Sequence, residues 1–343
     1  MRVLVTGAGA PGGAGIINAL LAEEGVEVIS GDKDKYAAGK FLTKNFVLLE
    51  NAKHDDFVES LIASIIAHQI DLIIPLVTDE LNILSKNLNR FEEIGCKVLV
   101  SKEDDLLIAN SKGKLYLHLK EAGIITPRFQ VCSDFSSFEK NLHNLGYPNV
   151  PVVMKPSNSN GSRGIRVIDE SIDSASILFN EKPGSLKVTY SLLRPILEKA
   201  KLPELVLAEY LPGQEITVDT IIANGNVLLE VQRTRQNIRS GISVAGQFVY
   251  LEQISETVSA IARSLPGLFG PIGFQFKQAK DGMYKILEIN PRLQGTTVAA
   301  LGLGLNIPIM CLKLLKGEEV NYKNKSENIS FVRYYKELFY DRL

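Results

Sequence analysis

A strand-like segment from Lys285 to Arg292 carries the side chains with the clearest chemistry in this sequence. In an extended strand, side chains two positions apart share a face, so Glu288 and Asn290 would point to one side. Their oxygens suit Mg²⁺, which takes few protein carboxylates and leaves its other positions to water and phosphates. Arg292 would hold a phosphate beside the metal. The pattern predicts a nucleotide–metal site; a half-buried edge strand with its polar face in water is the alternative.

A second candidate site combines a lysine with a loop of small polar residues. Lys155 ends an apolar strand that begins at Val150, and the loop from Asn158 to Gly164 follows. A triphosphate needs a point charge and a cover rich in N–H and hydroxyl donors, and this segment offers both. It is not a P-loop, because the lysine precedes the glycines. A hairpin with a soft turn has the same composition and is the alternative.

Two further segments could contribute to such a site. Between Leu207 and Glu215 a strand, a Pro-Gly break and another strand follow one another. This connector would offer backbone groups to a purine edge and Glu215 to the ribose hydroxyls, although an exposed strand–turn–strand unit explains it about as well. Gln275 lies between two phenylalanines of a predicted strand and faces away from them. It is either a third oxygen ligand or a polar group on a solvated face.

Three arginines, Arg233, Arg235 and Arg239, follow a predicted strand in an otherwise charge-balanced chain. Surface arginines are most often simply solvated. The functional alternative is a clamp for a carboxylate or an acyl phosphate, because the guanidinium group binds such anions through two parallel hydrogen bonds.

A glycine-rich turn, Gly7 to Gly13, joins the first predicted strand to the first helix, and Asp32 ends the second strand. This is the context of the dinucleotide fingerprint, in which glycines let the backbone approach a phosphate and the acid binds a ribose. An NAD-dependent oxidoreductase is therefore a competing interpretation. However, Pro11 removes one N–H donor, and the same turn serves to pack the helix against the sheet.

Periodicity predicts the elements that would position these residues. Apolar runs alternate with amphipathic segments over the first hundred residues, which predicts a parallel, doubly wound sheet. Its strands are expected at 3–5, 26–29, 72–74 and 98–100, and its helices at 16–21, 57–68 and 80–91. Further strands are expected at 150–155, 165–168, 205–210, 215–223, 227–233, 272–278 and 284–289, with helices at 114–122 and 254–264. This second part predicts an α+β fold with a largely antiparallel sheet.

Composition narrows the functional classes. The 343 residues are enough for two or three domains, and the net charge of −1 provides no basic surface for nucleic acid or an anionic membrane. No apolar run reaches the length of a membrane span. The chain begins with a strand rather than a signal peptide, and its three cysteines lack the spacing of a metal site. A cytoplasmic protein with reduced thiols is therefore expected.

Taken in order, these features resemble the ATP-grasp superfamily, and more narrowly its carbamoyl-phosphate synthase large-subunit-like branch. The likeness extends from the first strand to about residue 318. It implies an α/β N-terminal pre-ATP-grasp (Rossmann-like) domain followed by α+β ATP-grasp domains. The expected boundaries are 1–108 for the first domain, 109–204 for a small subdomain with a phosphate lid, and 205–343 for a catalytic subdomain with the Mg²⁺ site. In such proteins the glycine-rich turn helps to form the acceptor site rather than binding NAD.

The resemblance implies a nucleotide site built from two lysines, a glycine-rich lid and the connector. The residues concerned are Lys112, Lys155, Ser159, Gly161, Ser162, Gly164, Glu209, Tyr210, Leu211 and Glu215. The lysines and the lid would hold the phosphates of ATP, the backbone at 209 and 211 would contact adenine, and Glu215 would bind the ribose. Ala208 departs from the pattern, because many relatives carry an acid there that touches the adenine amino group. Base selectivity would then rest on backbone contacts.

The resemblance also implies a metal site and an acceptor pocket. Gln275, Glu288 and Asn290 would bind Mg²⁺, and Arg292 would neutralise charge on the transferred phosphoryl group. Arg239 and the loop from Gln294 to Thr297 are expected in the acceptor pocket.

The reaction implied is phosphoryl transfer from ATP to a small-molecule carboxylate, followed by attack of an amine on the acyl phosphate to give an amide. A homodimer is expected at the family level. Two alternatives use the same fold: an ATP-dependent kinase or carboxylase, and a nucleotide-binding regulatory module without turnover. A full carbamoyl-phosphate synthase would need a second, similar half, and this sequence has one.

Overall fold

The computed structural model describes residues 1–343 except 160, 162, 182–183, 240, 324–327 and 341–343. The chain forms two compact units, each made of more than one segment. Unit 1 consists of residues 1–107, 216–275 and 289–343, and unit 2 of residues 108–215 and 276–288. The three-part division predicted from the sequence is a different partition and stays a prediction.

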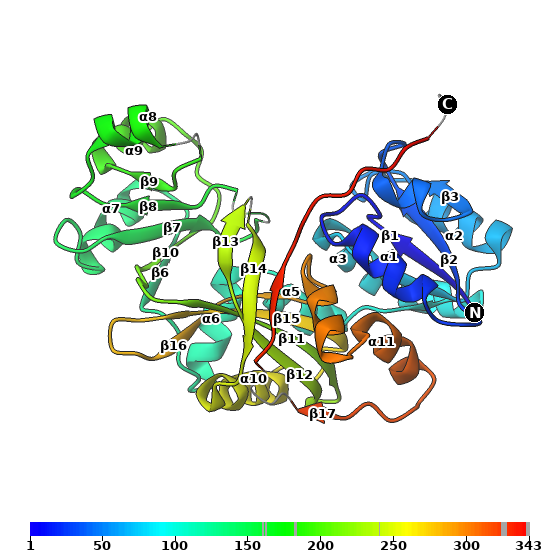
Figure 1. Cartoon of the computed structure of the whole chain (residues 1–343). Coiled ribbons are helices and arrows are strands. Elements are labelled where there is room, and N and C mark those ends of the chain that lie inside the picture. Colours follow the sequence, from blue (N-terminus) through cyan, green and yellow to red (C-terminus); the bar gives the residue numbers. More distant parts are fainter. Residues whose placement is uncertain (160, 162, 182–183, 240, 324–327, 341–343) are drawn as a thin grey trace. The chain divides into compact units, whose positions relative to one another are not determined.

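Unit 1 begins with a five-stranded sheet in the order β3-β2-β1-β4-β5 (Figure 1). Its strands are β1 (Arg2–Thr6), β2 (Glu27–Asp32), β3 (Asn45–Leu48), β4 (Leu72–Pro75) and β5 (Lys97–Val98). All neighbouring pairs are parallel. The central strands β1, β2 and β4 are buried along most of their length, which continuous apolar runs allow in a sheet covered on both faces. The predicted Rossmann-like class of this part is confirmed.

Helices accompany this sheet, namely α1 (Gly13–Leu21), η1 (Ala38–Phe41), α2 (Phe57–His68), α3 (Thr78–Lys86), α4 (Leu88–Glu93) and α5 (Glu103–Ala109). In α2, Phe57, Leu61 and Ile65 recur every four residues and are buried, as an amphipathic helix requires. The single helix predicted at 80–91 is wrong. Asn87 separates α3 from α4, and its Nδ2 donates a 2.8 Å hydrogen bond to the carbonyl of Ile83. An asparagine side chain that bonds to nearby backbone competes with the helix.

The second sheet has the order β13-β14-β12-β11-β15-β16, with β17 beside β12 and β18 beside β14. Its strands are β11 (Glu215–Ala223), β12 (Asn226–Thr234), β13 (Gln236–Arg239), β14 (Ile242–Val249), β15 (Gly270–Gln278), β16 (Tyr284–Asn290), β17 (Tyr322–Lys323) and β18 (Ser330–Val332). The β11–β12, β12–β14 and β13–β14 pairs are antiparallel, which confirms the predicted class. Residues 276–288 of the β15–β16 hairpin belong to unit 2. The helices of this part are α10 (Glu252–Ser264), η2 (Thr297–Leu303) and α11 (Ile307–Leu315).

Unit 2 contains a five-stranded sheet in the order β6-β10-β7-β8-β9. Its elements are α6 (Lys112–Glu121), β6 (Phe129–Cys132), α7 (Phe135–Asn144), β7 (Val152–Pro156), β8 (Arg166–Ile168), α8 (Ser174–Asn180), β9 (Lys187–Val188), α9 (Tyr190–Leu197) and β10 (Leu205–Glu209). Phe138 and Leu142 of α7 share a buried cluster with Leu205 and Leu207 of β10. Alternate residues of β10 therefore face the helix, which fixes the register of the strand.

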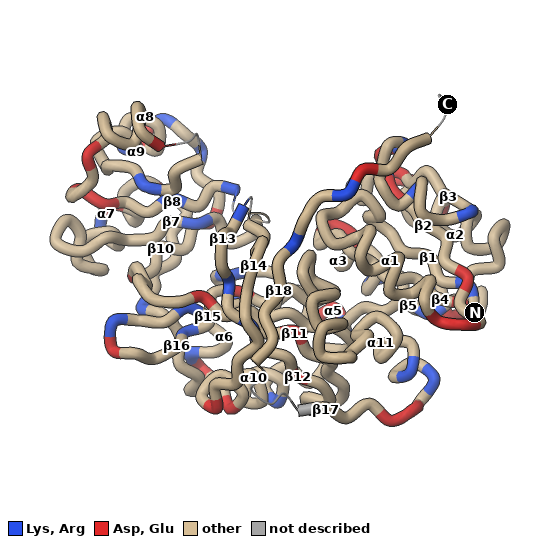
Figure 2. Tube along the Cα trace, viewed as in Figure 1, with Lys and Arg blue, Asp and Glu red and all other residues tan. Residues whose placement is uncertain are grey.

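Charges and cysteines are distributed as in an ordinary globular chain. Lys and Arg are interspersed with Asp and Glu along the elements of both units (Figure 2). Cys96, Cys132 and Cys311 are buried free thiols. Within the described part of the chain, no single helix is both long and apolar enough to cross a membrane, and only the bent pair η2 and α11 passes a test of length and composition.

Candidate functional site

Unit 2 brings Lys112 and Glu288 together. Lys112 is the first residue of α6, whose N-cap Ser111 accepts a hydrogen bond from the N–H of Lys114. Lys112 Nζ lies 3.2 Å from Glu288 Oε2 and donates a 2.9 Å hydrogen bond to the carbonyl of Ser159. The lysine side chain is 7% exposed and the glutamate side chain 27%. The carboxylate is therefore accessible to a ligand while the ammonium group is held in place.

Lys155 is buried in the same region of unit 2. Its Nζ donates hydrogen bonds to Tyr116 Oη (2.7 Å) and to the carbonyl of Leu287 (3.3 Å). Burial, and next the positive charge of Lys112, lower the pKa of Lys155 to about 7, while Glu288 opposes this effect. Two buried amines thus share one carboxylate. An added anion would stabilise the charged form of both.

The segment predicted to be a phosphate lid contacts one of these lysines, because the carbonyl of Ser159 accepts a hydrogen bond from Lys112. Ser159, Gly161 and Gly164 are described, whereas Asn160 and Ser162 lie outside the described residues. Gly161 and Gly164 have φ angles of 62° and 74°, a region that favours glycine. A Cβ at position 164 would lie 2.7 Å from Cγ of Pro156. Both the backbone angle and the packing therefore require glycine at 164. The role of the loop as a lid stays a prediction.

A charged cluster fixes the start of the predicted adenine connector. Glu209 accepts hydrogen bonds from Lys285 Nζ (2.6 Å), Arg128 N (2.9 Å) and Arg128 Nε (3.2 Å). Burial alone would raise the pKa of Glu209, but the hydrogen bonds from Lys285 and Arg128 outweigh it and the pKa is lowered. The Glu209 side chain is thus an anion held in place by Lys285 and Arg128.

The rest of the connector joins β10 to β11. Leu211 is buried and Tyr210 half-buried, and Ala208 lies within the sheet at 3% exposure. Glu215, the first residue of β11, accepts a 3.0 Å hydrogen bond from Lys277 Nζ. Contact of these residues with a nucleotide stays a prediction.

Gln275 of unit 1 is held by an arginine that the sequence singled out. Arg235 donates from Nη1 to Gln275 Oε1 (2.6 Å), from Nη2 to the carbonyl of Gly241 (2.5 Å) and from Nε to Ser243 Oγ (3.2 Å). The neighbours of Gln275 in β15, Phe274 and Phe276, are fully buried, so the predicted alternation of this strand is confirmed. Arg235 therefore fixes the orientation of the amide oxygen.

Arg292 follows β16 and contacts the N-terminal part of unit 1. Its Nε donates to Thr78 Oγ1 (3.2 Å) and its Nη1 to the carbonyl of Leu293 (2.9 Å). Asn290 is the last residue of β16 and is half-buried. Because Gln275 and Asn290 belong to unit 1 and Glu288 to unit 2, the predicted Mg²⁺ ligand set is divided between the units and stays a prediction.

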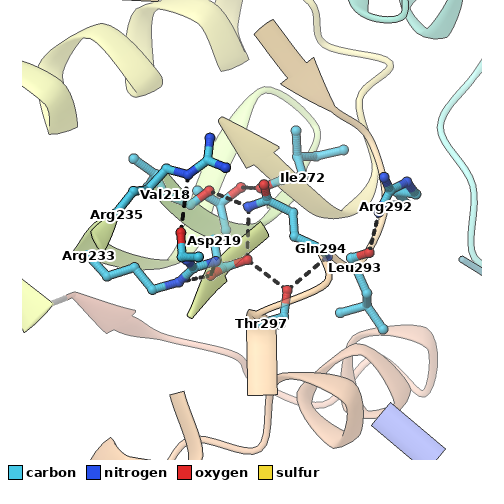
Figure 3. Close-up of polar contacts among 11 residues, drawn as sticks. Val218, Asp219, Arg233, Arg235, Ile272, Arg292, Leu293, Gln294 and Thr297 are labelled. Carbon is cyan, nitrogen blue, oxygen red and sulfur yellow. Dashed lines mark hydrogen bonds and ion pairs between the residues drawn. The ribbon is translucent and has the colours of Figure 1, made fainter. Parts of the chain in front are cut away.

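Asp219 organises a buried polar network in unit 1 (Figure 3). Its Oδ2 accepts from Arg233 Nε (3.0 Å) and Nη2 (2.9 Å), and its Oδ1 accepts from Gln294 Nε2 (3.0 Å) and Thr297 Oγ1 (2.7 Å). Arg233 is 1% exposed, so the interpretation of it as a solvated surface arginine is wrong. Gln294 and Thr297, which were expected in the acceptor pocket, both bind Asp219, and their role in that pocket stays a prediction.

Arg239, another arginine of the cluster predicted from the sequence, lies on a different strand from Arg233. Arg239 is exposed at the end of β13, and the adjacent Ser240 lies outside the described residues. A signal for the network was present in the sequence, because Asp219 interrupts the apolar strand Ile216–Ala223. A buried acid of this kind requires a partner.

Asp32, the acid of the predicted dinucleotide fingerprint, binds backbone N–H groups of the chain itself. Asp32 Oδ2 accepts a 2.8 Å hydrogen bond from the N–H of Gly9, and Oδ1 accepts from the N–H of Asp34 (2.9 Å). A Cβ on Gly12 would lie 2.7 Å from Cα of Gly295. These contacts support the packing interpretation of the turn.

A residue that the sequence analysis missed, Glu80, accepts a hydrogen bond from Thr6, and mainly burial raises its pKa to about 7.

The donor chemistry of the predicted ligand set fits Mg²⁺. One carboxylate and two amide oxygens are hard ligands, and the remaining positions would be left for water and phosphates. Gln275 Oε1 already accepts a hydrogen bond, but an amide oxygen has a second lone pair for a metal. Within the described part of the chain, no group of three or more His, Cys, Asp or Glu side chains is arranged to hold a metal.

A parallel Rossmann-like sheet, an antiparallel sheet, and a lysine pair against the Glu-x-Asn strand are the features that the resemblance to the ATP-grasp superfamily implies. Residues 3–99 match the family "PylC-like, N-terminal domain", and residues 201–338 match "ATP-grasp in the biosynthetic pathway with Ter operon". The chain therefore carries an ATP-grasp domain and a PylC-like N-terminal domain, which confirms the resemblance found in the sequence.

Known relatives agree with this assignment. The chain is 27% identical over 215 residues to the carbamoyl phosphate synthase large chain of Kocuria rhizophila, which covers 59% of this chain but 17% of that protein. The fold is similar to that of N5-carboxyaminoimidazole ribonucleotide synthetase in its ADP complex, with a TM-score of 0.69 and 14% identity over 96% of this chain and 80% of the other. It is also similar to an L-amino acid ligase from Bacillus licheniformis, with a TM-score of 0.63 and 17% identity over 91% and 73%.

Proposed function

We propose that this protein is an ATP-dependent carboxylate–amine ligase. The γ-phosphoryl group of ATP passes to an oxygen of a small carboxylate and ADP leaves. The amine nitrogen then attacks the acyl phosphate, an amide bond forms, inorganic phosphate leaves and the amine gives up a proton. The names of the neighbouring enzymes support this reaction class, since they include a synthetase and an amino acid ligase.

The observation that carries the proposal is the cluster in unit 2. Two buried lysines, Lys112 of α6 and Lys155 of β7, lie against β16, whose Glu288 side chain is 27% exposed. The cluster combines two positive charges with one negative charge, and both lysines are buried away from water. A polyphosphate would supply the missing negative charge, and a divalent cation would bridge it to the carboxylate.

The chain's own groups would bind and orient the reactants. Lys112 and Lys155 hold the phosphates together with the loop of Ser159, Gly161, Ser162 and Gly164, and Glu209 to Leu211 and Glu215 hold the nucleoside. Gln275, Glu288 and Asn290 would hold Mg²⁺, which when bound neutralises charge on the phosphates. Arg292 would neutralise charge on the transferred phosphoryl group, and Arg239 would face the acceptor. Positioning and fixed charges supply most of the catalysis in phosphoryl transfer, so no side-chain nucleophile is needed.

The test is product analysis after a screen of amino acids and other small carboxylates with amines. The proposal requires ADP and phosphate, released in a one-to-one ratio with the amide. AMP and pyrophosphate would contradict it, because they indicate adenylation. Phosphate retained on the product would indicate a kinase, consumption of bicarbonate a carboxylase, and nucleotide binding without turnover a regulatory module. Binding of NAD without binding of ATP would overturn the assignment altogether. We also propose a homodimer, which light scattering of the purified protein would test.

A further inference from the structure

Arg233 has more hydrogen-bonding capacity than its partner uses. Asp219 receives four hydrogen bonds, two of them from Nε and Nη2 of Arg233 (Figure 3). The remaining nitrogen, Nη1, is buried and has no hydrogen-bond partner among the described residues. A buried donor without a partner costs roughly 1–3 kcal/mol. A group bound from outside would remove that cost.

A second arginine lies close to the first. Arg333 follows β18, and burial together with the positive charge of Arg233 lowers the pKa of its guanidinium group. Arg333 is half-buried, and its Nη2 donates a 2.8 Å hydrogen bond to the carbonyl of Pro11. The guanidinium group of Arg333 thus feels the positive charge of Arg233, while Asp219 is hydrogen-bonded to Arg233. An anion between the two guanidinium groups would relieve their repulsion.

Helix α1 begins at the same place. Pro11 precedes its N-cap Gly12, and α1 has neither a side-chain cap nor an acidic residue in its first turn. The backbone of Gly12 packs against Gly295, which lies in the loop whose Gln294 and Thr297 bind Asp219. A chain of contacts through Asp219, Gln294 and Gly295 therefore connects Arg233 to the N-terminus of α1, and Arg333, which is electrostatically coupled to Arg233, contacts Pro11 at the same helix end. The uncapped N–H groups at a helix N-terminus attract anions.

We propose that Arg233, Arg333 and the N-terminus of α1 form a subsite in unit 1 for an anionic group, a carboxylate or a phosphate, on the acceptor substrate. This inference rests on the proposed function, and it adds that the acceptor carries a second acidic group besides the one that is activated. Planar guanidinium groups bind either anion through paired hydrogen bonds.

The experiment is a thermal-unfolding titration of the full chain at constant ionic strength. Inorganic phosphate and acetate are the probes, added in separate series with a saturating non-hydrolysable ATP analogue, so that the lysines of unit 2 are already occupied. The unfolding temperature of the wild type should rise with probe concentration, and the probe that acts at the lower concentration identifies the preferred group. In Arg333→Gln the same rise should require about tenfold to a hundredfold more anion.

Two further variants make the test specific. Arg233→Lys keeps a positive charge for Asp219 but lacks Nη1, and it should weaken the response like Arg333→Gln. Arg90→Gln removes a surface arginine that pairs with Glu59 of α2, and it should respond like the wild type. The subsite is overturned if the wild type binds the nucleotide analogue but its stability is unaffected by both anions. It is equally overturned if both test variants respond like Arg90→Gln. Failure to bind the analogue would instead contradict the proposed function, because that binding depends on unit 2.

Discussion

Lys112 Nζ lies 3.2 Å from Glu288 Oε2, so the residue proposed to hold the phosphates and the residue proposed to hold the metal form one ion pair. In this arrangement each group is neutralised by the other until a ligand arrives. Nucleotide and metal would then replace the pair by two separate interactions. The consequence is that neither residue can be altered without changing the environment of the other.

Replacement of Glu288 by alanine should lower ATP turnover at least about a hundredfold, because it removes the charged metal ligand. It also leaves Lys112 without its carboxylate, which should cost roughly 1–3 kcal/mol of unfolding free energy. Steady-state kinetics and urea unfolding measure the two effects. Glu121→Ala, an exposed change at the end of α6, is the control. Turnover close to that of the control would contradict the assignment of Glu288.

Lys155→Met should separate stability from binding. The methionine fills a similar volume without a buried charge, so the unfolding temperature should stay constant or rise. Nucleotide affinity should fall about tenfold to a hundredfold, because a charge-assisted contact to the phosphates is lost. Calorimetric titration with ADP and a melting curve test this, with the exposed Lys201→Met as control. An unchanged affinity would exclude Lys155 from the phosphate site.

Glu80 should make unit 1 less stable at neutral than at acidic pH. Its pKa is raised from 4.5 to about 7, so the carboxyl group is protonated in both the folded and unfolded states below pH 4.5. As pH rises through this window the unfolded state loses the proton first, and stability falls by about 3 kcal/mol at 1.36 kcal/mol per pH unit before levelling off above pH 7.

Glu80→Gln should flatten this part of the profile, since glutamine does not titrate. The exposed Glu92→Gln should keep the slope of the wild type. Unfolding free energies between pH 4.5 and 8 provide the measurement. Parallel profiles for all three proteins would show that Glu80 does not titrate as described.

Gly164→Ala should be more harmful than Gly123→Ala. Both glycines have positive φ, 74° and 71°, so the backbone strain of alanine is shared. Only at 164 would the new methyl group lie 2.7 Å from Pro156, whereas nothing lies within 4 Å at 123. We expect an additional loss of roughly 1–3 kcal/mol at 164, together with weaker nucleotide binding. Equal losses in the two variants would mean that the loop moves freely away from Pro156.

Local sequence patterns sufficed for most strands and for the order of the fold, because alternation and apolar runs report burial directly. They failed where the burial or contact of a residue depends on a partner that is distant in the sequence. Arg233 looks like a surface residue until Asp219 of the neighbouring strand is placed beside it. The contact of Arg333 with Pro11 joins opposite ends of the chain, and no short pattern predicts it. The ordered ATP-grasp motifs identified the candidate site residues, but the tyrosine beneath Lys155 carries no motif at all.

The order of the segments also bears on how the protein is made. The chain leaves unit 1 after residue 107, returns at 216, leaves again after 275 and returns at 289. Unit 2 therefore includes a short segment, residues 276–288, that the ribosome synthesises well after the main segment of this unit. Unit 1 is complete only when residues 289–343 have also been synthesised. Neither unit corresponds to one uninterrupted stretch of coding sequence. A polypeptide translated only as far as residue 288 would lack the last segment of unit 1 and could not complete that unit. Proteases in the cell should therefore remove it.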